Sequence, residues 1–482
     1  MKDADENGGM TMQRLFAKLG LGESSQERNR AQAAARKLVA AAVFEADAAQ
    51  AGDDTMQTDR WVSQPKAALQ SLLNEPDSVT PPPLDVIQRK YGCFTEIFDS
   101  AGHHESGALR VAVKDVFAFD GHRPTAGLPS APDWLALDPS PVIQRLLSAG
   151  GRIVGTTKLS PWCYLPIEHN EFVAPPRNPA GADLLVGGSS SGSAVAVASG
   201  AVPVALGTDT GGSVRIPAAL SGVLGFKPTA GRIPLEGVVP LGKTQDTIGI
   251  LARKTECLSN LFSVLANDRA KFAGQAGSDL GIAVPKAIFE HADPQIVAAA
   301  ARARVQLSDA GYEVAETLPL PLGALNAVAG VITGHEAGQY HVDGLVNRPD
   351  CYAPSVRDRL LVGLSIHSSE YRKALETRAT LRHHVLSRVF GTADFVMLPT
   401  VNCFAPKVLP GDDPDPAAIS ALSLELLSLN RWVNLLGLPA ISIPLSLPGA
   451  LPTSIQIVGR PHSDERIIEI AGIFEQTTAS SN

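Results

Sequence analysis

Two glycine- and serine-rich segments contain the residues of this sequence that are best suited to chemistry. The first reads GGSSSGS at residues 187–193, and the second reads GTDTGGSVR at residues 207–215. Glycine lets the backbone adopt positive φ and approach a ligand closely, so successive N–H groups in such loops can bind an anion. That anion is either a fixed phosphate or the oxyanion of an acyl-transfer transition state.

Three interpretations of these segments can be compared from the residues alone. A phosphate loop needs GxxxxGK[ST] or GxGxxG at a strand-to-helix turn, and neither pattern nor any lysine occurs here. A nucleophile elbow GxSxG is present at residues 188–192 and would make Ser190 the nucleophile of an α/β-hydrolase. Residues 180–186 read poorly as the strand that an elbow requires. A loop of structural serines leaves the second segment and its Asp209 unexplained.

Taken together, the two segments resemble the amidase signature family. The resemblance is nearly position for position from Gly187 to Arg215 and continues to Arg232. It extends to a Val-Lys-Asp run at 113–115 and a Gln-Ile-Val-Gly-Arg run at 456–460, and it covers roughly residues 83–475. The resemblance implies an α/β/α sandwich in which helices flank a large mixed β-sheet.

The family's Ser–cis-Ser–Lys triad falls on three residues here. The resemblance implies that Ser213 is the nucleophile, that Ser189 is a bridging serine preceded by a cis peptide, and that Lys114 is the base. Serine needs a base to become nucleophilic, and no histidine lies near either loop in sequence. A neutral lysine can serve if burial lowers its pKa from about 10.4. Lys114 ends the apolar run at 111–113 and is suitably placed for burial.

The same resemblance supplies an oxyanion hole and part of a substrate pocket. The backbone N–H groups of Thr210, Gly211 and Gly212, with that of Ser213, are expected to bind the oxyanion. Cys163 and Ser189 are expected to contact substrate, although a buried neutral thiol is the more frequent role of such a cysteine. Trp162 and Tyr164 beside Cys163 suggest apolar walls for the acyl group. Ser191, where the family more often has glycine, raises a question about backbone conformation at that position.

Other polar residues have structural interpretations. Asp115 is expected to accept hydrogen bonds, and Asp209 and Arg215 are expected to brace the nucleophile loop. Surface positions are predicted for the histidine pairs at 103–104 and 383–384. Because no cluster of histidine and acidic residues suggests a metal site, neither a metal nor a cofactor is expected.

The elements that must position these residues follow from hydrophobic patterning. Short apolar runs near 111–113, 153–154, 202–206, 282–284, 395–398, 441–445 and 455–458 alternate with helical patterns at 141–149, 294–310 and 463–476. This alternation predicts an α/β layered sheet. Residues 1–80 are predicted to be a helical N-terminal arm, and residues 81–482 the catalytic domain.

Composition limits the kinds of partner. The chain has 482 residues, 44% hydrophobic, and a net charge of −8 with dispersed lysines and arginines, which argues against a nucleic-acid surface. Five cysteines without CxxC spacing favour a reducing, cytoplasmic location over a disulfide framework. The N-terminus has no secretory pattern, and the most apolar stretch, 193–207, is too short to span a membrane.

The function expected from these observations is hydrolysis of a carboxylic amide, of the linear, non-peptide kind, to an acid and an amine or ammonia. The partner expected is a small-molecule amide, and a homodimer is compatible with the sequence. Two alternatives stay open: an amidotransferase subunit of a tRNA-dependent complex, and a non-catalytic scaffold of the same family. Because a scaffold would be expected to lose the lysine or a serine, the presence of all three disfavours it.

Overall fold

A computed structural model describes residues 82–98, 108–266, 280–409, 414–445 and 451–479. The helical arm predicted for residues 1–80 lies outside the described residues, as do His103 and His104. None of the helices in the described parts of the chain is long and apolar enough to cross a membrane.

Eleven strands of the described residues form one mixed sheet. Its order is β1-β3-β2-β4-β6-β5-β10-β11-β9-β7-β8. The strands are β1 (Phe94–Ile97), β2 (Leu109–Lys114), β3 (Gly151–Thr157), β4 (Val204–Asp209), β5 (Leu224–Lys227), β6 (Thr247–Ala252), β7 (Gly281–Pro285), β8 (Glu313–Thr317), β9 (Phe395–Pro399), β10 (Ala440–Leu445) and β11 (Thr453–Gly459). Strand β2 runs parallel to both of its neighbours, β3 and β4, whereas β4, β6, β5, β10, β11 and β9 pair antiparallel in succession.

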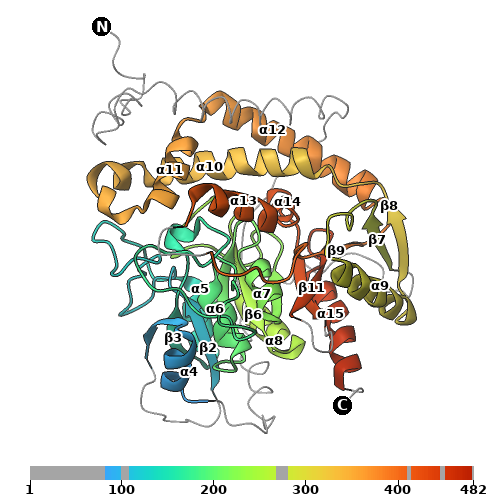
Figure 1. Cartoon of the computed structure of the whole chain (residues 1–482), viewed down its shortest axis with the longest axis horizontal. Helices are drawn as coiled ribbons and strands as arrows, with labels where there is room; N and C mark the ends of the chain where they lie inside the picture. The colour runs from blue at the N-terminus through green and yellow to red at the C-terminus, as the bar shows by residue number, and fades with distance from the viewer. Residues whose placement is uncertain (1–81, 99–107, 267–279, 410–413, 446–450, 480–482) are drawn as a thin grey trace.

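Helices cover the sheet, and some of them lie across the top of the molecule in the view of Figure 1. They are α4 (Leu84–Tyr91), α5 (Pro141–Ser148), α6 (Ser191–Ala198), α7 (Arg215–Ser221), α8 (Thr255–Leu265), α9 (Pro294–Asp309), α10 (Leu322–Asn347), α11 (Pro354–Leu364), α12 (Ser368–His384), α13 (Pro416–Leu427), α14 (Arg431–Leu435) and α15 (Asp464–Ala479). Short turns of helix occur at η1 (Pro161–Cys163), η2 (Pro349–Cys351) and η3 (Val385–Val389). Figure 1 shows α10, α11 and α12 running across the top of the molecule, where α10 packs against α11, α12 and α14.

The core divides between the two faces of the sheet. In β2, Val111 and Val113 belong to the main hydrophobic cluster, and Ala112 between them belongs to a second cluster with residues of α6. Alternation of this kind is the period-2 geometry of a strand that is buried on both faces. Helices therefore pack on both sides of the sheet, as in the α/β/α arrangement that the sequence predicts.

Two short helices are buried along their whole length. Every described residue of α6 except Ala198 is buried, and so is every residue of α7. Helix α6 consists only of alanine, glycine, serine and valine, whose small side chains allow neighbouring elements to approach from all sides, and α7 has two alanines and a serine among its seven residues. Because the two Gly/Ser segments lead directly into these helices, the segments lie inside the protein.

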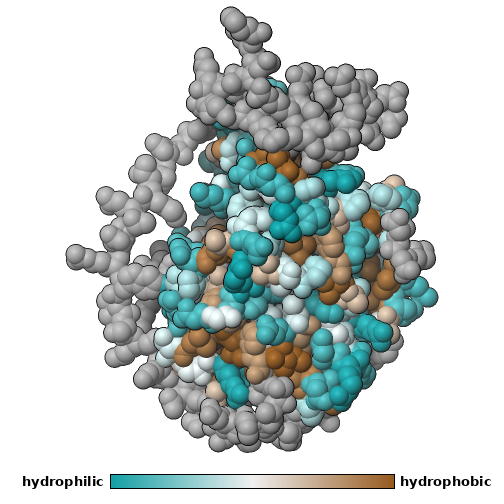
Figure 2. All heavy atoms as spheres, turned by 90° about the vertical axis from the view of Figure 1, so that its left-hand side faces the viewer, coloured by the Kyte–Doolittle hydropathy of each residue, from teal (hydrophilic) through white to brown (hydrophobic). Residues whose placement is uncertain are grey.

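The predicted strands at 111–113, 153–154, 202–206, 282–284, 395–398, 441–445 and 455–458 correspond to β2, β3, β4, β7, β9, β10 and β11. The predicted helices correspond to α5, α9 and α15, and His383 and His384 end α12. Figure 2 shows the face on the left of Figure 1, where hydrophilic residues interrupt the hydrophobic ones over most of the described surface.

Candidate active site

Lys114 is fully buried at the end of β2. Its Nζ donates hydrogen bonds to Ser189 Oγ at 2.7 Å and to Thr208 Oγ1 at 2.8 Å. Burial lowers the pKa of Lys114, and the nearby Cys163 thiol and the carboxylates of Asp209 and Asp246 act in the opposite direction. The site therefore favours a neutral amine, the form in which a lysine can accept a proton.

Ser189 lies in the loop before α6 and is fully buried. The Gly188–Ser189 peptide bond is cis, as the sequence predicts. Glu168, which the sequence analysis missed, fixes the start of this loop by accepting hydrogen bonds from Val186 N at 2.9 Å and Gly187 N at 3.0 Å. Burial raises the pKa of Glu168 to about 7, although the two N–H donors act to lower it.

Ser213 lies in the tight turn between β4 and α7, and Asp209 organises this turn. The Asp209 carboxylate accepts hydrogen bonds from Gly212 N at 2.8 Å and Val214 N at 3.1 Å. Gly212 has φ +121°, and a Cβ there would lie 2.7 Å from the Asn430 Cβ. Only glycine fits this position without displacing Asn430, the residue before α14.

Arg215 secures the other side of Asp209. Its Nε and Nη2 donate to the two carboxylate oxygens at 3.1 and 2.9 Å, and both side chains are fully buried. Arg215 also donates to Asn434 Oδ1 at 2.7 Å and to Gln456 Oε1 at 3.0 Å. Although burial raises the pKa of Asp209, the Arg215 charge overrides this and holds that pKa well below its usual range. The bracing role predicted for Asp209 and Arg215 matches these contacts.

The backbone donors near Ser213 are not equivalent. Among the described residues, the N–H groups of Thr210, Gly211 and Ser213 have no hydrogen-bond acceptor, whereas the N–H of Gly212 donates to Asp209. Of the four N–H groups expected to bind the oxyanion, that of Gly212 therefore already has an acceptor in the structure, the Asp209 carboxylate. Thr210 is held by a 2.6 Å hydrogen bond from its hydroxyl to Asp246, another residue that the sequence analysis missed.

Of the two hydrogen bonds expected for Ser189, to Lys114 and to Ser213, the structure contains the one to Lys114. Lys114 contacts Ser189, but within the described residues no hydrogen bond joins Ser189 Oγ to Ser213 Oγ. The two serine loops are instead linked through the backbone, where Ser190 N donates to Ser213 O at 3.1 Å. Catalytic hydrogen bonds are often long in a protein without substrate and shorten in its complexes.

Ser190 does not have the geometry of an elbow nucleophile. It is fully buried, and its Oγ donates to Thr208 O at 3.2 Å and accepts from Thr208 N at 3.3 Å. No described strand leads into residue 190, and its hydroxyl is occupied by the backbone of β4. Ser191 begins α6 and is not among the described residues with positive φ, so the backbone does not require glycine at that position.

Cys163 and Trp162 are both buried. Cys163 is buried, with its Sγ 3.9 Å from Thr208 Oγ1, so the thiol lies beside a partner of Lys114. Trp162 stacks between Trp134 and Tyr352, at ring separations of 5.5 and 5.4 Å, and donates to a backbone carbonyl. Trp162 is therefore a core residue behind the site, and Tyr164 is the partly exposed aromatic of the pair.

Asp115 is a structural acceptor, as predicted. It accepts from the Thr125 hydroxyl at 2.6 Å and lies 2.9 Å from His122 Nε2. No three histidine, cysteine or acidic residues within the described ranges gather into a metal-binding group.

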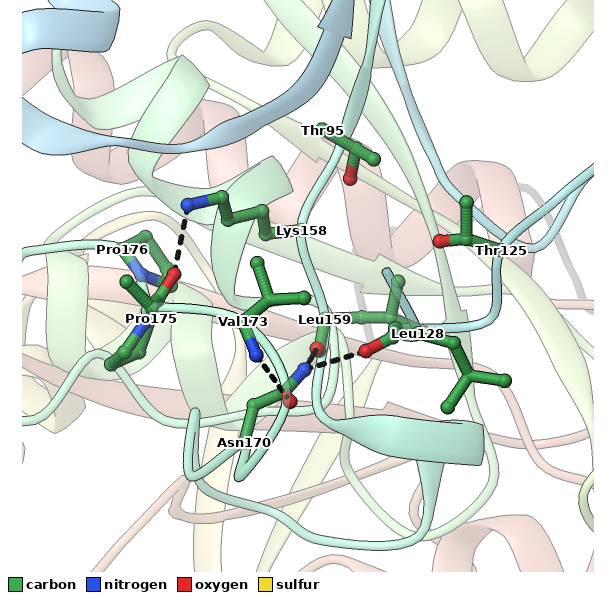
Figure 3. Close-up of a pocket in the computed structure, with 11 residues that line it drawn as sticks. Thr95, Thr125, Leu128, Lys158, Leu159, Asn170, Val173, Pro175 and Pro176 are labelled. Carbon is green, nitrogen blue, oxygen red and sulfur yellow. Dashed lines mark hydrogen bonds between the residues drawn. The ribbon is translucent and has the colours of Figure 1, made fainter. Parts of the chain in front are cut away.

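A small cavity lies apart from the lysine and the two serines. It has a volume of about 20 Å³, room for roughly one water, and is lined by residues of the 158–176 region together with Thr95 and Thr125. Figure 3 shows how Lys158 points across it to the Ala174 carbonyl, at 2.8 Å, and how Asn170 ties its wall to Leu159. The cavity is too small for an organic substrate.

Comparison with known proteins identifies the family of this arrangement. The Amidase family model matches residues 107–468. A glutamyl-tRNA(Gln) amidotransferase subunit of Symbiobacterium thermophilum is 32% identical over 420 residues, 78% of this chain and 85% of that protein. The 2-amino-5-chloromuconic acid deaminase of Comamonas testosteroni is 32% identical over 379 residues, 75% of this chain and 80% of that protein.

Solved structures share the fold. The crystal structure of an amidase superposes with a TM-score of 0.71 at 28% identity, covering 86% of this chain and 96% of that one. The corresponding glutamyl-tRNA(Gln) amidotransferase subunit from Thermotoga maritima superposes with a TM-score of 0.69 at 26% identity, covering 85% and 94%.

Proposed function

The chain belongs to the amidase signature family, and from this premise we propose that it hydrolyses a carboxylic amide through an acyl-enzyme on Ser213. The observation that carries the proposal is the buried Lys114, whose Nζ lies 2.7 Å from Ser189 Oγ. Burial favours the neutral form of this lysine, and no carboxylate among the described residues forms a hydrogen bond or ion pair with its Nζ.

In the first half-reaction, Ser213 Oγ attacks the amide carbonyl carbon. Its proton passes to Ser189 Oγ, whose own proton passes to Lys114 Nζ. The oxyanion is stabilised by the N–H groups of Thr210, Gly211 and Ser213. As the C–N bond breaks, Ser189 gives a proton to the leaving nitrogen and regains one from Lys114.

In the second half-reaction, a water molecule attacks the acyl carbon and gives its proton to the same relay. The C–O bond to Ser213 breaks, the acid leaves, and the serine recovers its proton from Ser189. The relay requires Ser189 to rotate toward Ser213 when substrate binds, because the hydroxyl contacts Lys114 before binding.

A serine-directed phosphonate tests the nucleophile. We expect its mass on the peptide that carries Ser213, with labelling lost in Ser213→Ala and retained in the matched control Ser190→Ala, whose hydroxyl bonds the backbone of β4. Labelling of Ser190, or an unlabelled Ser213 in active protein, would overturn the proposal.

A second candidate is favoured by one specific observation: a relative with 32% identity is named as a component of a glutamyl-tRNA(Gln) amidotransferase. If the chain works in such a complex, the purified chain should release no ammonia from amides by itself and should do so once partner chains are added. A turnover on simple amides that partner chains leave unchanged would favour a self-sufficient hydrolase.

A further inference from the structure

Arg431, the first residue of α14, lies directly against the nucleophile turn. A Cβ added to Gly211 would be 3.1 Å from Arg431 Cγ and 3.8 Å from its Nε. The guanidinium continues toward α10, where a Cβ on Gly330 would be 3.8 Å from its Nη1. Because Gly211 precedes Ser213 by two residues and carries a free N–H, the arginine lies beside the place where an amide would react.

The Arg431 guanidinium is unusual because it has no partner of its own. Within the described parts of the chain it forms no hydrogen bond and no ion pair, whereas Arg215 in the same region is bound by Asp209 and by two amide side chains. An arginine has five N–H donors, and leaving them unpaired in a largely buried place is costly.

A second positively charged side chain lies near Arg431. Burial lowers the pKa of Arg431 to about 10, and the like charge of Arg359 on α11 acts in the same direction. The Tyr164 phenol lies close to both arginines and acts oppositely. No carboxylate contributes to the pKa of Arg431. Arg359 itself donates to the neutral hydroxyl of Ser420, at 3.3 Å.

These three side chains come from separate segments and are all partly exposed to solvent. Arg431 therefore lies against the turn, and the Arg359 guanidinium and the Tyr164 phenol are close enough to interact electrostatically with it. Guanidinium presents paired donors that match the two oxygens of a carboxylate, and the match is strongest where water is largely excluded.

We propose that the substrate amide carries a carboxylate, which binds at Arg431 with help from Arg359 and Tyr164 while the amide carbonyl lies at Ser213. The inference rests on the proposed amide hydrolysis and specifies its substrate class as short monoamides of dicarboxylic acids and related acidic amides. Neutral amides of the same length leave the guanidinium unpaired and bind less well.

Paired substrates test this class. The acid amides malonamate, succinamate and glutaramate are compared with propionamide, butyramide and valeramide, in which a methyl group replaces each carboxylate. We expect wild type to prefer at least one acid amide over its neutral counterpart by about 10- to 100-fold in kcat/KM. Arg431→Met, which keeps the stem that covers Gly211, should remove this preference mainly through KM, so that each acid amide and its neutral counterpart have similar kcat/KM.

Arg357→Met is the matched control, because Arg357 lies on α11 near Arg359 but pairs with the exposed Asp358. It should keep the acid preference. If Arg431→Met does not fold, Arg359→Met takes its place with the same expected loss. Equal kcat/KM for acid and neutral amides in wild type would overturn the inference and leave the proposed hydrolysis standing.

Binding separates the inference from catalysis. Calorimetry with succinamate, malonamate and glutaramate on Ser213→Ala measures recognition without turnover, and adding Arg431→Met to this variant should weaken binding by about 10-fold or more. If wild type hydrolyses no amide of either series, the proposed function is in question, and this binding result still decides whether the carboxylate site exists. No binding of any acid amide to Ser213→Ala would overturn it.

Discussion

Replacing Asp209 by asparagine tests whether the turn between β4 and α7, which contains Ser213, is held in place by charge. The carboxylate accepts from two backbone N–H groups of the turn and pairs with both Nε and Nη2 of Arg215. Asparagine keeps the shape but offers one oxygen and an NH2 group that cannot accept. Arg215 would then be a fully buried cation without a counter-charge.

The cost of that change can be estimated. Removing one partner of a buried ion pair costs about 3–5 kcal/mol. Unfolding entropy of roughly 2.1 cal/mol/K per residue over 482 residues gives about 1 kcal/mol per degree, so Tm should fall by about 3–5 °C. Because the pKa of Asp209 is held far below neutral, the stabilisation is complete above the unfolded pKa of about 4 and is lost only in strong acid. The fall in Tm should be the same at pH 6 and pH 8.

Thermal unfolding at one scan rate measures this effect, with Asp183→Asn as the control. Asp183 is exposed, and its carboxylate lies 3.5 Å from the Nζ of the exposed Lys407. Its substitution should therefore shift Tm by less than about 0.5 °C. Asp209→Asn should also lower kcat by about 10-fold or more. The asparagine side chain has one acceptor oxygen and cannot bind the N–H groups of Gly212 and Val214 as the carboxylate does, so the turn is held less firmly in its orientation. An Asp209→Asn protein with unchanged Tm and kcat would refute the reasoning.

Three further predictions concern the relay. Lys114→Met should lower kcat by about 10²–10⁴-fold with little change in KM, and the wild-type rate should rise with pH because the neutral amine is the active form; a bell-shaped profile near pH 6 would contradict this. Ser189→Ala should be severely slowed yet retain more activity than Ser213→Ala in the same assay, and equal total loss would count against separate roles. Glu168 has a pKa of about 7, raised from 4.5, so the folded protein binds the extra proton and loses up to about 3 kcal/mol of stability as pH rises from 4.5 through 7. Glu168→Gln should remove that part of the pH dependence of Tm, measured between pH 5 and pH 8; an unaltered dependence would contradict it.

The residues that could be predicted from the sequence are those that lie in a recognisable local motif. The Gly/Ser signature carries the resemblance to the amidase signature family, and that resemblance implied both the contact between Lys114 and Ser189 and the cis bond. Strands β1, β5, β6 and β8 were not predicted. β1 and β5 are only four residues long, and β6, whose six residues are all buried, shows no alternation of polar and apolar residues.

The residues that the sequence did not predict are those defined by distant partners. Glu168 looks like an ordinary loop acid until its two backbone donors are known. Gly212 looks like any other donor of the turn until Asp209 folds back onto it. Arg431 has no motif around it, and its position against Gly211 depends on how α14 meets a turn more than 200 residues earlier in the chain. Local pattern contains no information about such contacts.

The network around Arg215 also sets the order in which a working enzyme can be made. Its hydrogen bond to Gln456 spans 241 residues, and that to Asn434 spans 219. A chain emerging from the ribosome exposes Ser213 long before β11 exists to complete the support beneath it. Because domains fold as units once their long-range contacts can form, we expect the turn that carries Ser213 to gain its full support only after β11, the last described strand, has been synthesised. Fragments that end before Gln456, whether from premature termination or proteolysis, would carry Ser213 without the Gln456 side chain that accepts a hydrogen bond from Arg215.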